Sequence, residues 1–131
     1  MEKEKLISHW ISSSDRDFKA MEHLFKNGDF TWSLFIGHLM VEKLLKAYYV
    51  KKIEAQPPFI HNLLRLAEKS KLELTEEQED ILDTISTFNI QARYDDIKLK
   101  FFKKCSEEFT ELWINKIKGL RKWIKKQLLK F

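Results

Sequence analysis

The chain has 131 residues, of which 44% are hydrophobic and 34% are charged, and its formal net charge is +4. This length predicts one domain over residues 1–131, and this balance is typical of a globular protein rather than a disordered chain. Three glycines and two prolines argue against a β-sandwich or barrel, because such folds need many turns.

Apolar spacing predicts two long helices in the first half of the chain. Residues 3–26 carry hydrophobic side chains at steps of three and four, which is the period of a helix with one buried face. Gly28 is expected to end this helix, since glycine accepts the left-handed conformation, and Asp29 is expected to cap the next. Residues 30–53 are apolar nearly all round, which predicts the central helix of a bundle that ends before the prolines at 57–58.

The second half of the chain is predicted to hold shorter helices and one long final helix. A short helix is expected at 60–70, and Thr75 with the glutamine three residues later has capping-box spacing for a helix at 75–89. Residues 90–97 form a polar break, and the remainder is predicted to be helical with a kink near Cys105. The expected fold is therefore all-α, an up-and-down antiparallel bundle of about five helices that resembles a four-helix bundle.

The sequence shows no sign of export or of membrane insertion. Cys105 is the only cysteine, so an internal disulfide is excluded and a reducing cytoplasm is the expected location. The first residues mix acids and bases without a long apolar run behind them, unlike a secretory signal. The most apolar stretch, 32–50, contains His38, Glu42 and two lysines and is too charged to span a bilayer.

Positive charge is concentrated at the C-terminal end of the sequence. Residues 116–131 contain seven lysines and arginines and no acid, so this end carries +7 and the other 115 residues sum to −3 (4 − 7). A basic end on a mildly acidic body could contact phosphate or an acidic partner. The alternative is a solvated helix end whose cations suit the C-terminal dipole.

Three polar side chains form a line on the otherwise apolar helix at 30–53. His38, Glu42 and Lys46 follow one another at steps of four, and Lys43 lies nearby. Buried without partners, such groups would destabilise the fold, so they need partners or water. The functional interpretation is a polar pocket or dimer seam that could hold phosphate. The structural alternative is a Glu42–Lys46 ion pair beside a hydrogen-bonded His38.

Two further polar positions are candidates because of where they fall on the predicted helices. Asp17 lies within about 40° of the centre of the first helix's apolar stripe, and we expect it to pair with a lysine of the 30–53 helix. His61 and Asn62 follow the proline pair. They are interpreted either as site residues at the mouth of the bundle or as side chains that satisfy the free N–H groups of a helix start.

The polar break contains the sharpest cluster of functional side-chain types, Arg93, Tyr94, Asp95 and Asp96. Arg93 could form a forked contact with phosphate, Tyr94 could stack on a base, and the acids could hold the arginine in place. The alternative is a surface Arg–Asp pair with Tyr94 packed beside it. No phosphate-binding glycine loop, metal-ligand spacing or catalytic triad is present in the sequence, so no metal or cofactor is expected.

Four segments of the chain, taken in order, carry a resemblance to a known family. They are Trp10–Ala20 with Leu24, Phe35–Ala47, Pro57–Leu63 with Leu66, and Ala92–Tyr94. In this order and spacing they resemble the HEPN family. The resemblance implies an up-and-down bundle of about five helices that is usually a homodimer. It also implies frequent pairing with a small nucleotidyltransferase, sometimes as a toxin–antitoxin system.

Many HEPN relatives are metal-independent RNases, and this sequence departs from their motif. The motif is an arginine, four to six residues and a histidine on a late helix at the dimer seam, where the pair would stabilise phosphate charge and transfer protons. No histidine follows Arg93, and the last one is His61. Arg16 and His23 fit the spacing, but they lie on the first helix and are interpreted as a chance match.

The leading hypothesis is therefore a non-enzymatic HEPN homodimer that binds a nucleotide, an RNA or a nucleotidyltransferase partner. Its candidate binding residues are Arg93, Tyr94, Asp95, His38, Glu42, Lys43, Lys46, His61 and Asp17. One alternative is an RNase with a degenerate motif, in which Tyr94, His38 or His61 supplies the acid–base chemistry. The other is a non-catalytic interaction module that uses the basic end.

Overall fold

Six α-helices form the computed structural model, which describes residues 2–53 and 56–130. No strand occurs within these residues, so the all-α prediction is confirmed. The helices are α1 (Lys3–Lys26), α2 (Phe30–Ile53), α3 (Leu63–Lys69), α4 (Glu76–Gln91), α5 (Asp95–Lys104) and α6 (Glu107–Leu128).

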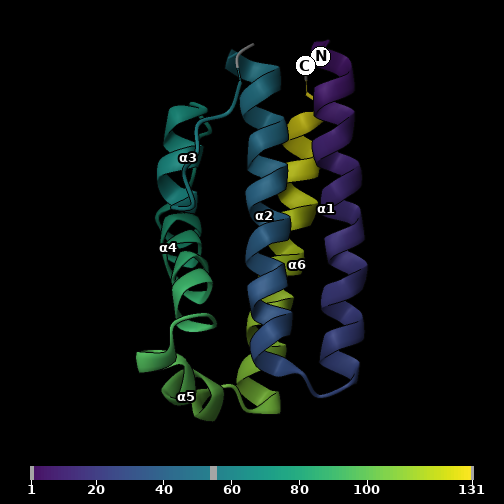
Figure 1. Cartoon of the computed structure of the whole chain (residues 1–131). Helices are drawn as coiled ribbons and strands as arrows, with labels where there is room; N and C mark the ends of the chain where they lie inside the picture. Colours follow the sequence, from purple (N-terminus) through teal and green to yellow (C-terminus); the bar gives the residue numbers. More distant parts are fainter. Residues whose placement is uncertain (1, 54–55, 131) are drawn as a thin grey trace.

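The helices pack as an up-and-down bundle around α2 (Figure 1). α1 runs antiparallel to α2 on one side, α3 and α4 follow one another down the other side, and α6 lies behind α2. α5 crosses one end of the bundle, far from the start of α1. α2 contacts each of the other five helices, which explains why its sequence is apolar nearly all round.

The structure contains the predicted glycine after α1 and the predicted capping box at the start of α4. Gly28 has a φ of +83°, in the left-handed region where a side chain would be strained. The Thr75 hydroxyl accepts a hydrogen bond from the Gln78 N–H at 3.1 Å, and the Gln78 side chain accepts from the Thr75 N–H at 2.9 Å. This reciprocal arrangement confirms the predicted capping box at the start of α4.

The segment between α4 and α6 differs from the prediction. α4 continues to Gln91 and α5 already begins at Asp95, so the break is shorter than residues 90–97. The expected kink is a complete helix end, because Cys105 leaves the helical conformation with a ψ of 68°. The Ser106 hydroxyl then caps α6 by accepting the Phe109 N–H at 3.1 Å.

The core is built from side chains of α2 with those of α1, α3, α4 and α6. The Phe88 ring stacks on Phe101 at 5.5 Å and meets the edge of Trp113 at 5.7 Å, so that α4, α5 and α6 are joined by aromatic contacts. A Cβ on Gly37 would lie 2.8 Å from the Cδ1 atom of Ile117, and glycine thus allows α2 and α6 to approach closely.

Part of the positive charge at the C-terminal end is neutralised by acids of α1. Asp15 accepts hydrogen bonds from Arg121 at 3.1 Å and from Lys125 at 2.7 Å. Glu22 pairs with Lys118 at 3.3 Å. Three of the seven cations of the basic end therefore connect α6 to α1. Across residues 2–53 and 56–130, no helix combines the length and apolar character that crossing a bilayer requires.

Candidate functional site

Glu42 is the centre of the polar line on α2. It is only 4% exposed, and its carboxylate binds two cationic or donor groups. The Lys46 ammonium lies 3.1 Å from Oε2, and Nδ1 of His61 lies 3.0 Å from Oε1. The predicted Glu42–Lys46 pair is thus present. His61, from the segment before α3, joins it as a second partner that helical spacing alone does not indicate.

His38 is fully buried at the inner end of the polar line. Its Nε2 atom lies 3.2 Å from the backbone carbonyl oxygen of His61. A carbonyl oxygen can only accept, so Nε2 carries the proton and Nδ1 is an acceptor, which has no hydrogen-bond partner among the described residues. Burial lowers the pKa of His38, although the bond to His61 and the charge of Glu42 oppose this effect. The ring is therefore neutral at pH 7.

His61 has the opposite environment, with a side chain that is 64% exposed. Because the Glu42 carboxylate can only accept, the Nδ1–H of His61 donates to it. The Nε2 atom of a neutral His61 is then free to accept a proton from a bound molecule. In a common acid–base arrangement, a carboxylate holds one imidazole nitrogen in place and the other nitrogen accepts or donates the proton.

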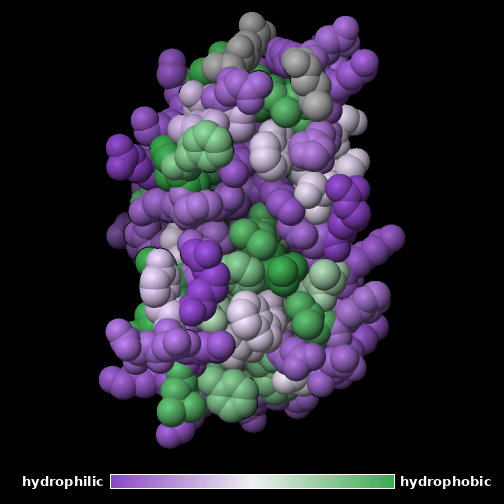
Figure 2. Space-filling model, viewed as in Figure 1, coloured by the Kyte–Doolittle hydropathy of each residue, from purple (hydrophilic) through white to green (hydrophobic). Residues whose placement is uncertain are grey.

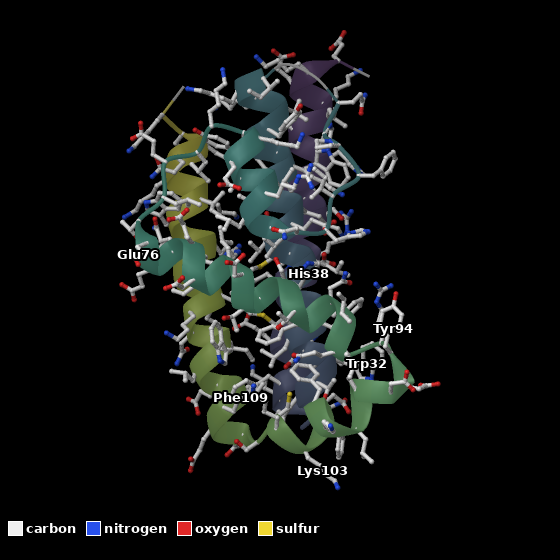
Figure 3. All side chains as sticks on the ribbon, turned by 90° about the vertical axis from the view of Figure 1, so that its left-hand side faces the viewer. Trp32, His38, Glu76, Tyr94, Lys103 and Phe109 are labelled. Carbon is white, nitrogen blue, oxygen red and sulfur yellow. The ribbon has the colours of Figure 1, made fainter. Side chains whose placement is uncertain are left out.

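Arg93 lies at the C-terminal end of α4 and remains exposed. Its Nε–H donates to the Asn89 carbonyl oxygen at 3.0 Å, and its guanidinium lies over the rings of Phe35 at 5.7 Å and Tyr94 at 6.0 Å. Its positive charge adds a minor contribution to the lowered pKa of His38, of which burial is the main cause. Figure 3 looks onto α4, with His38 near its middle and Tyr94 at its C-terminal end.

The acids that follow Tyr94 do not hold Arg93, so that expectation is wrong. Asp95 and Asp96 lie in the first turn of α5, where carboxylates are favoured by the free N–H groups and the helix dipole. Neither forms an ion pair with Arg93 within the part of the chain that the structure describes. The guanidinium instead turns back onto α4 and onto Phe35.

Asp17 and Lys43 form a separate pair on the α1 side of α2. The Lys43 ammonium lies 2.7 Å from Oδ2 of Asp17, which confirms that this acid pairs with a lysine of the second helix. Lys43 therefore faces α1 and does not join the polar line. Lys46 also contacts α1, because its ammonium lies 4.9 Å from the centre of the Trp10 ring.

Contacts join His38, Glu42, Lys46 and His61, and Arg93 lies over Phe35, which is about one helical turn before His38 on α2. We define these four polar residues together with Arg93 as the candidate site. Asn89 and Phe35 were not singled out from the sequence, although they orient the arginine. The sequence contains no signal for either contact, because Arg93 bonds to the backbone carbonyl of Asn89, which any residue would supply, and Phe35 looks like any other core aromatic.

The family comparison matches the HEPN domain over residues 7–127. The chain belongs to the HEPN family. No curated protein and no solved structure matches it. The match includes every residue of the candidate site, and it confirms the HEPN resemblance drawn from the four sequence segments.

The HEPN bundle leaves one face of α2 incompletely covered. Phe35, Ile36 and Leu39 are only partly buried although they lie in the N-terminal half of the central helix, and we call these three residues the α2 face. Figure 2 shows apolar surface between α1 and α4, over the middle of α2. Because Phe35 also contacts Arg93, this apolar surface borders the candidate site.

Proposed function

We propose that this HEPN protein is a cytoplasmic homodimer that binds a nucleotide or RNA through the candidate site and Tyr94. We propose further that it acts with a small nucleotidyltransferase partner, in a system of the toxin–antitoxin type. Membership of the HEPN family supports the link to nucleotides. The binding itself is supported by Arg93, an exposed guanidinium between aromatic rings that has no carboxylate partner among the described residues.

Arg93 and Tyr94 have the chemistry that a nucleotide requires. A guanidinium binds two phosphate oxygens at once through its planar fork of donors. Tyr94 is 57% exposed, so its ring can stack on a base without regard to sequence. Lys46 and His61 are already engaged by the Glu42 carboxylate. Arg93 is therefore the group expected to attract phosphate.

Replacing Arg93 with alanine tests the binding proposal. Titration calorimetry with ATP and with a short single-stranded RNA should show a loss of about 1–3 kcal/mol in binding free energy. Arg65→Ala is the matched control, because Arg65 is an exposed arginine of α3 that does not belong to the site. Unchanged binding by Arg93→Ala would remove this residue from the proposed site.

The dimer is proposed to cover the α2 face, because burying partly exposed apolar side chains of a central helix is favourable. Leu39→Arg should convert the dimer to a monomer in light scattering. Leu112→Arg should leave the dimer intact, since Leu112 is a 53% exposed residue of α6. A wild-type protein that is monomeric at high concentration would contradict the proposal.

A second candidate function, an RNase without the usual motif, is favoured by the Glu42–His61 pair. The exposed His61 ring could take the proton of a ribose 2′-hydroxyl while Arg93 stabilises the phosphate. A gel assay with labelled RNA should then show cleavage that both His61→Ala and Arg93→Ala abolish. Cleavage that does not exceed background for the wild-type protein would exclude this function for the RNAs used.

A further inference from the structure

A second concave region lies beneath α5, where it meets the turn between α1 and α2. The cavity has a volume of about 720 Å³, which is within the range of small-molecule pockets. It shares no lining residue with the candidate site. The lining residues are Gly28, Asp29, Phe30, Thr31, Trp32, Asp95, Lys98, Leu99, Phe102 and Cys105.

The walls of this cavity combine aromatic rings with carboxylates. Phe30, Trp32 and Phe102 supply three rings, and Trp32 and Phe102 remain 41% and 67% exposed. Asp29 and Asp95 are exposed acids that line the same space, and Lys98 is the single base of the lining. The lining therefore has a net charge of −1 (−2 + 1), which favours cations and disfavours phosphate or carboxylate ligands.

Lys98 shows how a cation can bind in this cavity. Its ammonium lies 5.7 Å from the centre of the Trp32 ring, within the range of a cation–π contact. Trp32 is supported from behind by Phe35, whose ring meets it edge-on at 5.6 Å. Lys98 is itself an exposed residue of α5, so it can leave the ring without disturbing the core.

One buried polar atom of the lining also lacks a strong partner. The Thr31 hydroxyl is buried and makes no regular hydrogen bond among the described residues, and its polar neighbour is the Cys105 thiol, a weak acceptor. Burial raises the pKa of Cys105, although Thr31 and the charge of Lys104 oppose the effect. The thiol is therefore neutral and unreactive at pH 7. The hydroxyl oxygen is itself buried, so it adds no open acceptor to the cavity.

We propose that this cavity binds a small organic cation, an ammonium group attached to an apolar or aromatic body. The ammonium would replace that of Lys98 over Trp32, in a cavity that Asp29 and Asp95 also line. The apolar body would contact Phe102 and Leu99. This site does not depend on the nucleotide-binding proposal, since Arg93 and the polar line take no part in it.

A series of probes with one body and different charges tests the preference. The probes are 2-phenylethylamine, 2-phenylethanol and 3-phenylpropionate, titrated into the full chain while the indole N–H signal of Trp32 is followed by NMR. The amine should bind about 2- to 30-fold more tightly than the alcohol, which is the range expected of a cation–π contact. The carboxylate should bind more weakly than either.

Two variants separate a cation site from a general apolar pocket. Lys98→Met removes the competing ammonium and should tighten amine binding at least about threefold. Its control, Lys100→Met, changes an exposed lysine of α5 that does not line the cavity and should have no effect. Trp32→Leu should weaken amine binding. Because this variant lacks the Trp32 signal, its binding is measured by calorimetry. The control is Phe59→Leu, which changes a fully exposed ring and should have no effect.

The proposal is overturned if the three probes bind equally, or if none shifts the Trp32 signal. It is also overturned if Lys98→Met weakens or does not change amine binding. Because Lys98 is exposed, this variant gives a decisive result even if Trp32→Leu fails to fold.

Discussion

Replacing Glu42 with glutamine should destabilise the bundle by about 2–3 kcal/mol. The carboxylate is nearly buried and accepts from Lys46 at 3.1 Å and from His61 at 3.0 Å. A buried hydrogen bond to a charged group contributes about 1.5–3 kcal/mol, and the Lys46 bond belongs to this class. The His61 bond adds less than about 1 kcal/mol because that ring is largely exposed. Glutamine retains one acceptor oxygen, but it leaves the Lys46 ammonium without a counter-charge.

The assay is urea denaturation followed by circular dichroism, with the free energy of unfolding compared at a constant denaturant slope. Glu111→Gln is the matched control. It makes the same chemical change at an exposed residue of α6 and should alter stability by less than about 0.5 kcal/mol. In a double-mutant cycle with Lys46→Met, the two sites should couple by about 1–2 kcal/mol. A cost below about 0.5 kcal/mol for Glu42→Gln would refute the view that this carboxylate holds the polar line together.

Three further predictions concern stability. Because burial lowers the pKa of His38 from 6.5, the unfolded chain takes up a proton there at a higher pH than the folded chain does. The free energy of unfolding should therefore fall as the pH drops below about 6.5. His38→Gln should flatten the plot of this free energy against pH in that range, measured by urea denaturation at several pH values. An unchanged slope would contradict the prediction. Thr75→Ala removes the capping box of α4 and should lower the free energy of unfolding by about 1 kcal/mol in urea denaturation; no loss would mean that the cap contributes nothing. Lys71 has a φ of 60°, in the left-handed region that is strained for a residue with a side chain. Lys71→Gly should therefore raise the free energy of unfolding by about 1 kcal/mol in the same assay. A decrease would refute backbone strain at this position.

Most of the helical architecture could be predicted because its signals are local. α1 and α2 have the bounds that apolar spacing and Gly28 indicate, and Thr75 marks the start of α4. The boundary between α5 and α6 was predicted at the right place but only as a kink near Cys105, whereas Cys105 leaves the helical conformation and the Ser106 hydroxyl caps a new helix. Apolar spacing alone does not distinguish a kink from a helix end, because it continues on both sides of either.

The candidate site was predictable only where its residues share one helix. Steps of four bring His38, Glu42 and Lys46 into line, and the same reasoning correctly gives Asp17 a lysine partner on α2. The approach of His61 to Glu42 depends on how the segment before α3 folds back, which no local spacing encodes. The orientation of Arg93 could not be foreseen either, because Asp95 and Asp96 satisfy the α5 N-terminus and not the arginine.

The weak attachment of α5 has a consequence for how the molecule fluctuates. With one fully buried side chain, this helix can detach at a much smaller free-energy cost than that of opening α1, α2 and α6 together. Its amide hydrogens should exchange with deuterated solvent far sooner than those of the long helices. We therefore expect α5 to open as a unit while the rest of the bundle stays folded, which would give small molecules easier access to the cavity that α5 lines.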